Sequence, residues 1–357
     1  MRKKLSRREM LRLMAIAGTV PLASCMPKGE TPSSTQTQTS VPTSTASPEP
    51  ATATPTDIPQ PTATQGVKKV AKVYMTTDIS AAGILKAYQA LERPAQGKVA
   101  VKVHSGEPGG TNFLTPDLIG SLVKDVNGTI VECDTAYHGR RFDPDSHMQV
   151  MIDHGFADIA PVDIMDAEGE MSIPITGGTR LTEDVVGSHF ANYDFFVNLA
   201  HFKGHPMGGF GGVIKNMSIG IASSMGKSLI HSAGKEKTGY GATTPQDEFL
   251  ESMAEAAKGV ADYLGDNIVY INVMRRLSVD CDCMGHPADP TMNDIGVLSS
   301  LDPVALDQAC VDLVYAAPDG EDLIARMESR NGIHTLEHAE AIGFGTRSYE
   351  IVDIDSI

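Results

Sequence analysis

Imidazole, ammonium and backbone amide groups are concentrated in residues 198–227, which read NLAHFKGHPMGGFGGVIKNMSIGIASSMGK. Glycines let backbone N–H groups approach a ligand closely, and Lys203 and Lys215 add positive charge to an acidic protein. This combination predicts a bound small anion, either a phosphate or a carboxylate. The other ligand candidates in the segment are Gly208, Gly209, Gly211, Gly212 and Asn216. A packed glycine-rich loop with its lysines in solvent is the alternative interpretation.

Two thiols lie two residues apart in DCDCMGH, residues 280–286. In an extended segment Cys281 and Cys283 point the same way, as alternate residues of a strand do. Thiolate and imidazole groups bind soft or borderline metals, so the segment predicts a site for a metal ion or a single iron–sulfur cluster. The predicted ligands are Cys133, His201, His205, Cys281 and Cys283. Free buried thiols, or a disulfide with Cys133, are the alternatives.

A third polar segment, DTAYHGRR at 134–141, with Cys133 directly before it, follows a predicted strand. Its paired arginines, Arg140 and Arg141, can clamp a carboxylate or phosphate, although each can also form a structural salt bridge. His104 ends another strand, ahead of SGEPGG. Several strand ends therefore carry polar groups beside flexible backbone, and their convergence on one crevice would form a site.

Strands and helices alternate along most of the chain. Short apolar or β-branched runs predict strands at 67–76, 98–104, 128–133, 195–200, 268–273 and 349–354. Helical spacing or capping pairs predict helices over 79–91 and 145–154, and after Thr115-Pro116, Thr244-Pro245 and Asp302-Pro303. The alternation is typical of an α/β fold with a mostly parallel sheet and helices on both faces, as a single large domain or two intimate lobes. Such sheets bind ligands at the carboxyl ends of their strands.

Composition narrows the function classes. The formal net charge is −16, and the first 24 residues hold six basic and one acidic residue, so their removal leaves about −21. A charge of this sign argues against nucleic acid as a partner. Tryptophan is absent and aromatic residues make up 5% of the chain, which disfavours base stacking. No nucleotide motif is complete, because Gly220–Ser228 has five residues between its glycines where a phosphate-binding loop has four.

The N-terminus carries the features of an export signal. A basic start precedes a short apolar stretch at 13–22, which is too brief to span a bilayer and is typical of a signal peptide over residues 1–24. Ser6-Arg7-Arg8 and the residues after it resemble a twin-arginine export motif. Leu22-Ala23-Ser24-Cys25 resembles a bacterial lipobox, in which Cys25 becomes the lipidated first residue. These motifs predict the twin-arginine export machinery as a partner and a lipid anchor in a bacterial membrane, with the domain on the extracytoplasmic side.

A low-complexity segment separates this signal from the rest of the chain. Residues 25–66 comprise Cys25 and a linker of mostly Thr, Ser, Pro, Ala and Gln without apolar periodicity. Such a segment cannot bury enough surface to offset the entropy cost of ordering it, so we expect a disordered stalk. The folded domain is expected to span residues 67–357.

Several motifs together resemble the DUF362 family, a group of largely uncharacterised proteins often described as iron–sulfur-centre proteins. The resemblance extends over about residues 98–353 and rests on VKVHSGEPGG, DTAYHGRR, the glycine-rich segment, DCDCMGHP, DIGVLSSLDPVALDQACVDLV and HTLEHAEAIGFGTRSYEI. It implies an α/β domain, thought to be redox-linked, whose members often carry a ferredoxin-type insert. This chain has no cysteine in residues 228–245, where such an insert would follow. Lipidation of Cys25 also leaves four of its five cysteines, whereas two ferredoxin clusters need eight thiolates.

Two functions fit these patterns. One is a lipid-anchored enzyme, dependent on a metal or an iron–sulfur cluster and linked to redox chemistry, with lysines and Arg140 holding an anionic substrate. The other is a lipid-anchored protein that binds a small anion without turnover and uses its cysteines structurally. The sequence identifies neither a reaction nor a catalytic residue.

Overall fold

An eight-stranded sheet lies at the centre of the residues that the computed structural model describes, 70–239 and 243–356. Its strands are Ala71–Thr76 (β1), Val99–Lys102 (β2), Thr129–Glu132 (β3), Val162–Ile164 (β4), Phe195–His201 (β7), Ile268–Met274 (β10), Gly296–Ser300 (β11) and Tyr349–Asp353 (β12). Their order in the sheet is β12-β1-β11-β10-β7-β2-β3-β4. Only β11 runs antiparallel to its neighbours, β1 and β10, among the described strands of this sheet. The predicted α/β class with a mostly parallel sheet is confirmed.

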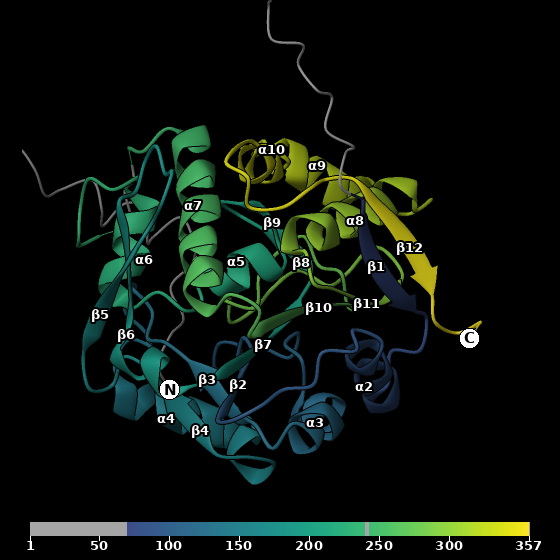
Figure 1. Cartoon of the computed structure of the whole chain (residues 1–357), viewed down its shortest axis with the longest axis horizontal. Helices are drawn as coiled ribbons and strands as arrows, with labels where there is room; N and C mark the ends of the chain where they lie inside the picture. The colour runs from purple at the N-terminus through teal and green to yellow at the C-terminus, as the bar shows by residue number, and fades with distance from the viewer. Residues whose placement is uncertain (1–69, 240–242, 357) are drawn as a thin grey trace, which may run out of the picture. The chain divides into compact units, whose positions relative to one another are not determined.

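Helices cover both faces of this sheet (Figure 1). One face carries α2 (Ala81–Gln89), α3 (Pro116–Asp125) and α4 (Pro144–Asp153), and the other carries α5 (Val213–Ser218), α7 (Gln246–Leu264) and α8 (Pro303–Ala316). Alternate residues of β7 enter different cores, with Phe196 and Ala200 on the α5 side and Val197 and Leu199 on the α3 side. This alternation follows from the period of two along a strand that is buried on both faces.

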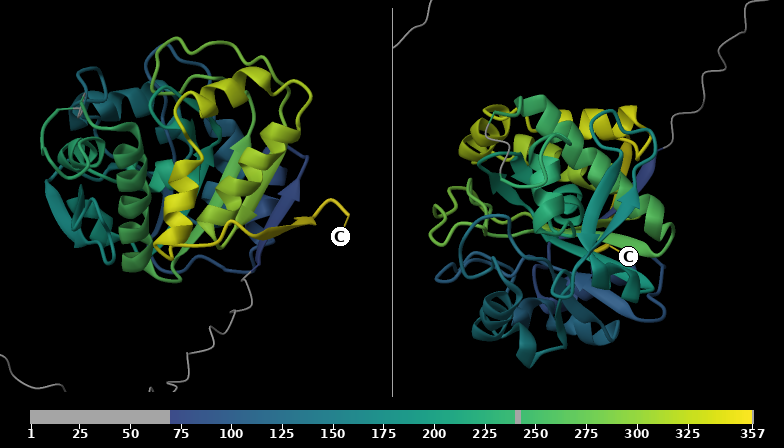
Figure 2. Two further views of the ribbon diagram at one scale, coloured as in Figure 1. Left: turned by 90° about the horizontal axis from the view of Figure 1, so that it is seen from above. Right: turned by 90° about the vertical axis from the view of Figure 1, so that its left-hand side faces the viewer.

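The first and last described strands lie side by side at one edge of the sheet. β12 pairs in parallel with β1, which places Ile351 opposite Val73. Figure 2 shows the yellow C-terminal strand next to the blue β1. The segment predicted as a strand at 349–354 therefore completes the sheet beside a strand far from it in sequence.

Helix starts coincide with the capping signals of the sequence. Asp302 accepts hydrogen bonds from the backbone N–H groups of Val304 and Ala305, both at 3.1 Å, and Pro303 is the first residue of α8. α3 likewise begins at a proline, Pro116, but the side chain of Thr115 before it makes no capping hydrogen bond. The apolar stripe of α7 is buried: Phe249, Met253, Ala256, Ala257, Val260 and Leu264.

Short elements connect these larger ones. They are the ribbons β5–β6 (Glu170–Pro174 and Glu183–Gly187) and β8–β9 (Lys203–His205 and Gly209–Gly211), the helices α6 (Ser224–His231), α9 (Glu321–Glu328) and α10 (His334–Ala341), and 3-10 turns at Phe156–Asp158 and Ser188–Asn192. The hairpin β8–β9 is formed by the glycine-rich segment. Strands of three residues are held by backbone pairing, so hydrophobic periodicity does not reveal them.

The sheet has a topological switch point beside β2. After β2 the chain adds β3 and β4 on one side, whereas β7 and β10 lie on the other side. In open α/β sheets a switch point leaves a crevice at the carboxyl ends of the adjacent strands. β2 ends at Lys102 and β7 ends at His201, so the segments that follow them enter this crevice.

The predicted signal peptide, Cys25 and the linker to residue 66 lie outside the described residues. All described residues belong to one compact unit, Gln65–Ile357. Within 70–239 and 243–356, no helix combines the length and the apolar character that crossing a bilayer requires.

Candidate ligand and metal site

A cavity of about 290 Å³ lies at the switch point, where β2 and β3 end. Its charged and imidazole groups are Glu132, Arg141, Lys215, Lys227, His104, His205 and His231. Pro206, Met207 and Ile219 add apolar surface. A larger hollow of about 540 Å³ lies near Asp302 and Phe344, but no histidine, cysteine, lysine or arginine lines it. The chemistry predicted from the sequence therefore belongs to the smaller cavity.

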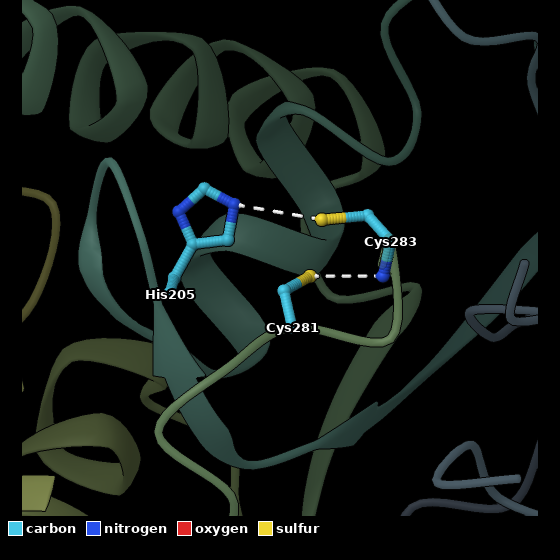
Figure 3. Close-up of side chains that lie close together, drawn as sticks. All are labelled: His205, Cys281 and Cys283. Carbon is cyan, nitrogen blue, oxygen red and sulfur yellow. Dashed lines mark hydrogen bonds between the residues drawn. The ribbon is translucent and has the colours of Figure 1, made fainter. Parts of the chain in front are cut away.

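His205, Cys281 and Cys283 lie close together (Figure 3), and His205 and Cys283 line the cavity. Their ligand atoms lie within 4.8 Å of one another, and the group could hold a metal ion. His205 is the last residue of β8, whereas both cysteines lie in the loop after β10. Cys283 Sγ is 4.0 Å from His205 Nε2, and the backbone N–H of Cys283 donates to Cys281 Sγ at 3.3 Å.

The other ring nitrogen of His205 fixes the imidazole in this orientation. Nδ1 accepts hydrogen bonds from the backbone N–H groups of Met207 at 3.2 Å and Gly208 at 2.8 Å. A neutral imidazole that accepts at Nδ1 carries its proton on Nε2, the atom that faces the sulfurs. Burial, and next the charge of Lys215, lower the pKa of His205 to about 4, so the ring is neutral at pH 7. A metal ion bound at Nε2 must replace that proton.

The two thiols differ in acidity. Contact with Cys283 and the charge of Lys215 lower the pKa of the Cys281 thiol, although burial acts in the opposite direction. The pKa of Cys283 is raised by Cys281 and by burial. The pair therefore favours a single thiolate at the fully buried Cys281, with Cys283 facing the cavity.

Asp282, between the two cysteines, ties their loop to β7 and β8. Its Oδ2 accepts a hydrogen bond from Lys203 Nζ at 2.7 Å and lies 2.8 Å from His201 Nδ1. Burial would raise the pKa of Asp282, but His201 and Lys203 hold it below its usual range. His201 Nε2 lies 2.6 Å from the carbonyl oxygen of Arg275. Both ring nitrogens of His201 are therefore within hydrogen-bond distance of an oxygen atom. Asp282 Oδ1 is buried and has no hydrogen-bond partner in the described part of the chain.

A buried ion network forms a second wall. Glu132 Oε2 accepts from Lys102 Nζ at 2.8 Å, and Glu132 Oε1 lies 3.3 Å from Arg141 Nη1. Arg141 Nε also donates to Glu107 Oε1 at 2.9 Å. Burial alone would raise the pKa of Glu132, but Lys102 and Arg141 lower it to about 2. Lys102 is fully buried and also contacts Asn216 Oδ1 at 3.3 Å, so the network joins β2, β3 and α5.

A chain of polar groups behind this wall has the order of a serine triad. His147 Nδ1 lies 3.0 Å from Asp134 Oδ1, and His147 Nε2 lies 3.5 Å from Ser105 Oγ. Ser105 is fully buried, does not line the cavity, and donates from Oγ to Glu132 Oε1 at 3.1 Å. A nucleophile needs access to its substrate, so this serine positions the Glu132 carboxylate instead.

The other two predicted metal ligands, Cys133 and His201, lie outside the group of His205, Cys281 and Cys283. Cys133 lines the cavity, but its Sγ donates to the carbonyl oxygen of Ile221 at 3.1 Å, and burial raises its pKa. All four described cysteines are free, so no disulfide joins Cys133 to the pair. Cys310 lies in the core of α8, 3.4 Å from Asn272 Nδ2.

The predicted anion ligands are also divided. Arg141, Lys215 and Asn216 line the cavity, whereas Lys203 is paired with Asp282 beside it. Arg140 does not line the cavity and forms a half-exposed pair with Asp153 Oδ2 at 3.1 Å. The neighbouring positions 140 and 141 therefore have different surroundings.

An acidic side chain of the protein occupies the backbone amides at the start of α5. The N–H groups of Val213 and Ile214 donate to the two carboxylate oxygens of Asp307 at 2.9 and 3.0 Å. A Cβ at Gly212 would lie 2.2 Å from Asp307 Oδ1, so glycine at this position lets the carboxylate approach.

The other three glycines that were predicted to bind the anion pack against neighbouring groups. Gly208 N donates to His205 Nδ1, and Gly209, with φ of +79°, lies against Gly332. A Cβ at Gly211 would lie 3.2 Å from Lys215 Cδ. These glycines shape the segment that presents His205 and Lys215 to the cavity.

Some residues of the site carry only weak signals in the sequence. Lys102 and Glu132 are charged residues at the ends of the apolar strands VAVK and TIVE. Charged residues are rarely buried unless they are paired. A lysine and a glutamate at the ends of two apolar strands therefore indicate a buried ion pair. Lys227 and His231 lie four residues apart on α6, and that spacing alone places them on one face.

A family model described as a domain of unknown function, DUF362, matches residues 99–312. The chain belongs to this family. The match extends from β2 into α8 and includes every residue of the cavity and of the His205, Cys281 and Cys283 group. DUF362 membership agrees with the motifs found in the sequence.

No curated protein matches the chain. Among solved structures, it is similar to the lactate racemase apoprotein from Thermoanaerobacterium thermosaccharolyticum, with 16% sequence identity and a TM-score of 0.39. The match covers 70% of this chain and 57% of that chain, so this DUF362 protein spans little more than half the length of that structure.

Proposed function

We propose that this DUF362 protein binds a metal ion at Cys281, Cys283 and His205, and a small organic anion in the adjoining cavity. One observation carries the proposal: three ligand atoms lie within 4.8 Å of one another, and two of their residues, His205 and Cys283, line a cavity that Lys215 also lines. The sequence brings these groups from two distant segments, and the fold joins them at a position where α/β proteins bind ligands.

The donor set suits a borderline metal ion. Two sulfurs and one imidazole nitrogen are typical ligands of zinc, and three protein ligands leave a position for water or a bound molecule. When bound, such an ion polarises a carbonyl or carboxylate oxygen as a Lewis acid. A four-thiolate iron–sulfur cluster has less support, because the thiol of Cys133 is hydrogen-bonded to Ile221 and Cys310 lies in the core.

The chain's own residues supply binding and proton-holding groups. Lys215 presents positive charge to the cavity, whereas the charge of Arg141, which also lines it, is paired with Glu107 and Glu132. Burial lowers the pKa of His231 to about 4, and its Nδ1 donates to the carbonyl oxygen of Lys227 at 2.6 Å. The ring is therefore neutral at pH 7 with its proton on Nδ1. A cavity with fixed cations and neutral imidazoles favours an anion that exchanges a proton, which supports an enzyme.

Metal uptake tests this proposal. The full chain, stripped with a chelator, is expected to take up about one Co²⁺ per chain and to show sulfur-to-cobalt charge-transfer absorption. A Cys281→Ser, Cys283→Ser double variant should lose both signals, whereas Cys310→Ser should keep them because Cys310 lies in the core. Wild-type protein that takes up no ion, and carries none when purified from an exporting host, would contradict the proposal.

The hydrogen bonds of His205 favour a second candidate, a protein that binds an anion without a metal. Because Nδ1 accepts two backbone N–H groups, Nε2 holds a proton and can donate to the Cys281 thiolate instead of to a metal. In that case the double cysteine variant should bind anions as well as the wild type. A parallel loss of metal and anion affinity in this variant would instead support the metal-dependent function.

We also propose that the protein is exported by the twin-arginine route and held by a lipid on Cys25 at the extracytoplasmic side of a bacterial membrane. The support is the order of the motifs in residues 1–25, with a basic start, an apolar stretch and a lipobox. The linker to residue 66 would then separate the folded domain, from residue 67, from the membrane.

A further inference from the structure

The two cysteines beside the cavity differ in how far a ligand can reach them. Cys281 is fully buried and does not line the cavity, whereas Cys283 is half-buried and lines it. Cys133 lines the cavity too, but its Sγ donates to the carbonyl oxygen of Ile221 at 3.1 Å. A molecule in the cavity therefore meets the thiol of Cys283 first, with the thiol of Cys281 next to it.

A turn holds these two sulfurs together. The backbone N–H of Met284 donates to the carbonyl oxygen of Cys281 at 3.0 Å, which closes a turn of four residues. Within the turn, the backbone N–H of Cys283 donates to Cys281 Sγ at 3.3 Å. The two sulfurs lie within 4.8 Å of each other, and Figure 3 shows them side by side.

Contacts of Asp282 fasten this turn to the rest of the fold. Its carbonyl oxygen accepts from the backbone N–H of Glu107 at 3.0 Å. Its carboxylate lies 2.7 Å from Lys203 Nζ and 2.8 Å from His201 Nδ1. The backbone and the side chain between the cysteines are therefore both anchored, so the thiols are neighbours before any ligand binds.

The separation of the cysteines suits a disulfide. The Cα atoms of residues two apart are at most about 7 Å from each other, and closer in a turn, whereas disulfides join Cα atoms about 4.4–6.8 Å apart. The sulfurs, now within 4.8 Å, need to approach by at most about 3 Å to reach bonding distance. Rotation of the two side chains can supply that movement.

We infer that Cys281 and Cys283 are a dithiol that reduces a compact disulfide of low molecular weight. Cys283 Sγ attacks one sulfur of the substrate in the cavity, forms a mixed disulfide and releases the first product thiol. Cys281 Sγ then attacks Cys283 Sγ and releases the second. The two cysteines lose two hydrogen atoms, one to each product thiol, so one substrate disulfide is reduced for each Cys281–Cys283 disulfide that forms.

This reaction would also control the metal site. Thiolates bind metal ions, and a disulfide of Cys281 and Cys283 removes two of the three ligands. Metal binding and oxidation therefore exclude each other, and this consequence alone rests on the proposed function. A volume of about 290 Å³ restricts the substrate to a small molecule.

Peptide mass mapping of the full chain tests the inference. The reduced, metal-free protein is treated with hydroxyethyl disulfide, free thiols are then alkylated, and the peptide with residues 281–283 is analysed. We expect a Cys281–Cys283 disulfide and two molecules of mercaptoethanol for each chain that reacts. Glutathione disulfide, which consists of two tripeptides, should react at least about tenfold more slowly because access limits thiol exchange.

Single variants test the order of attack. Cys281→Ala should accumulate a mixed disulfide at Cys283, because the second thiol is missing. Cys283→Ala should react at least about tenfold more slowly, because Cys281 is fully buried. Cys133→Ala changes another cysteine of the same cavity and should form the Cys281–Cys283 disulfide as the wild type does. A thermal unfolding curve shows whether each variant is folded.

Each outcome has a defined meaning. Free thiols at Cys281 and Cys283 in the treated wild type would overturn the inference, as would equal rates in Cys281→Ala and Cys283→Ala or equal rates with the two disulfides. Protein loaded with Co²⁺ is treated in parallel and should be protected. A metal-free protein that resists oxidation yet binds Co²⁺ would contradict this inference alone. Oxidation of the metal-free protein, together with no uptake of Co²⁺, would instead contradict the proposed metal site alone.

Discussion

At the scale of single residues, His205 connects the backbone of the glycine-rich segment to the two cysteine sulfurs. Its Nδ1 is held by Met207 N and Gly208 N, and its Nε2 faces Cys283 Sγ at 4.0 Å. One side chain therefore has a structural role on one edge of the ring and a chemical role on the other. An asparagine at this position can keep the structural role, since its Oδ1 lies in a similar place to Nδ1 and can accept the two hydrogen bonds. It has no atom that replaces Nε2 beside the sulfurs.

This division predicts different effects for two substitutions. His205→Ala should lower the free energy of unfolding by about 1–3 kcal/mol, because the two N–H groups lose their acceptor. His205→Asn should be less destabilising, yet both variants should weaken Co²⁺ binding by more than the roughly tenfold that the loss of a ligand's hydrogen-bonding partner costs, because each removes a ligand. Denaturant unfolding and metal titration measure the two effects. Equal Co²⁺ affinity in wild type and His205→Asn would remove His205 from the metal site.

Glu132 predicts a different outcome, because its loss leaves a buried charge. Glu132→Gln should destabilise the protein by about 3–5 kcal/mol, since the fully buried Lys102 loses its counter-charge. Adding Lys102→Met should recover part of that loss, with a coupling of about 1–3 kcal/mol in a double-mutant cycle. Arg140→Gln breaks an exposed pair and should cost at most about 1 kcal/mol. Additive losses in the cycle would show that the pair is not coupled.

The sequence predicts the cysteines of this site but not its ion pairs, and the reason is physical. Cys281 and Cys283 can be recognised because both thiols lie within three residues of one another. The pairing of Lys102 with Glu132 joins two strands across 30 residues, and only the sheet register shows it. Arg140 and Arg141 look alike in sequence, but burial separates a network residue from a surface one. Asp307, which occupies the amides of α5, comes from a helix 94 residues away from Val213.

At the scale of elements, α7 is fastened to its neighbours through Glu255. Its Oε1 accepts from Thr179 N at 2.7 Å and lies 2.9 Å from His338 Nε2 on α10, while Oε2 accepts from Arg180 N and Leu181 N. Burial would raise the pKa of Glu255, but these hydrogen bonds lower it from 4.5 to about 2. The carboxylate therefore stabilises the fold only while it is ionised.

The sign of this shift gives a pH dependence. The folded pKa lies below the unfolded value, so the contribution is complete above about pH 4.5 and is lost as the pH falls toward 2. Glu255→Gln should lower the free energy of unfolding near pH 7 and flatten its decline between about pH 4.5 and 2. Glu350→Gln, on the exposed part of β12, should leave the curve unchanged. Chemical unfolding at a series of pH values measures both, and an unaltered slope in Glu255→Gln would contradict the assignment.

The start of α5 predicts a steric effect in the glycine-rich segment. Gly212→Ala would place a Cβ 2.2 Å from Asp307 Oδ1, so either the carboxylate or the helix must move. We expect a loss of about 1–3 kcal/mol and weaker binding of anions, because α5 carries Lys215 and Asn216 into the cavity. Gly139→Ala meets nothing within 4 Å and serves as the control. Equal stability of the two variants would show that Asp307 does not constrain the segment.

The elements with local signals are the ones that the sequence predicts well. α3 and α8 begin at the predicted prolines, α7 begins directly after one, and β7 and β10 are apolar runs buried on both faces. β11 reads GVLSS and runs antiparallel to the strands on either side. Its position in the sheet depends on its pairing with two strands, β1 and β10, which are about 200 residues apart in the sequence. Neither strand direction nor order is encoded in the local pattern of apolar residues.

At the scale of the whole molecule, the acidic domain and the N-terminal motifs support each other. If residues 1–24 are removed as proposed, the net charge of about −21 gives no electrostatic attraction to anionic lipid, so a covalent anchor would be needed to hold the chain at a membrane. The described helices offer no membrane span. The proposed anchor and export route therefore depend on residues 1–25, where a stretch that resembles a twin-arginine motif precedes one that resembles a lipobox.

Lipid labelling tests that dependence. In a bacterial host fed with labelled palmitate, the full chain is expected to take up label, and the mature N-terminus should be a lipid-modified Cys25 by mass spectrometry. Cys25→Ala should remain unlabelled, while Cys310→Ala should label normally because Cys310 is buried in the core. Arg7→Lys with Arg8→Lys should also prevent labelling, since unexported protein does not meet the lipid-transfer enzyme at the outer surface of the membrane. Label that persists in Cys25→Ala would place the modification elsewhere, and an unlabelled wild type would mean that the chain is not a lipoprotein.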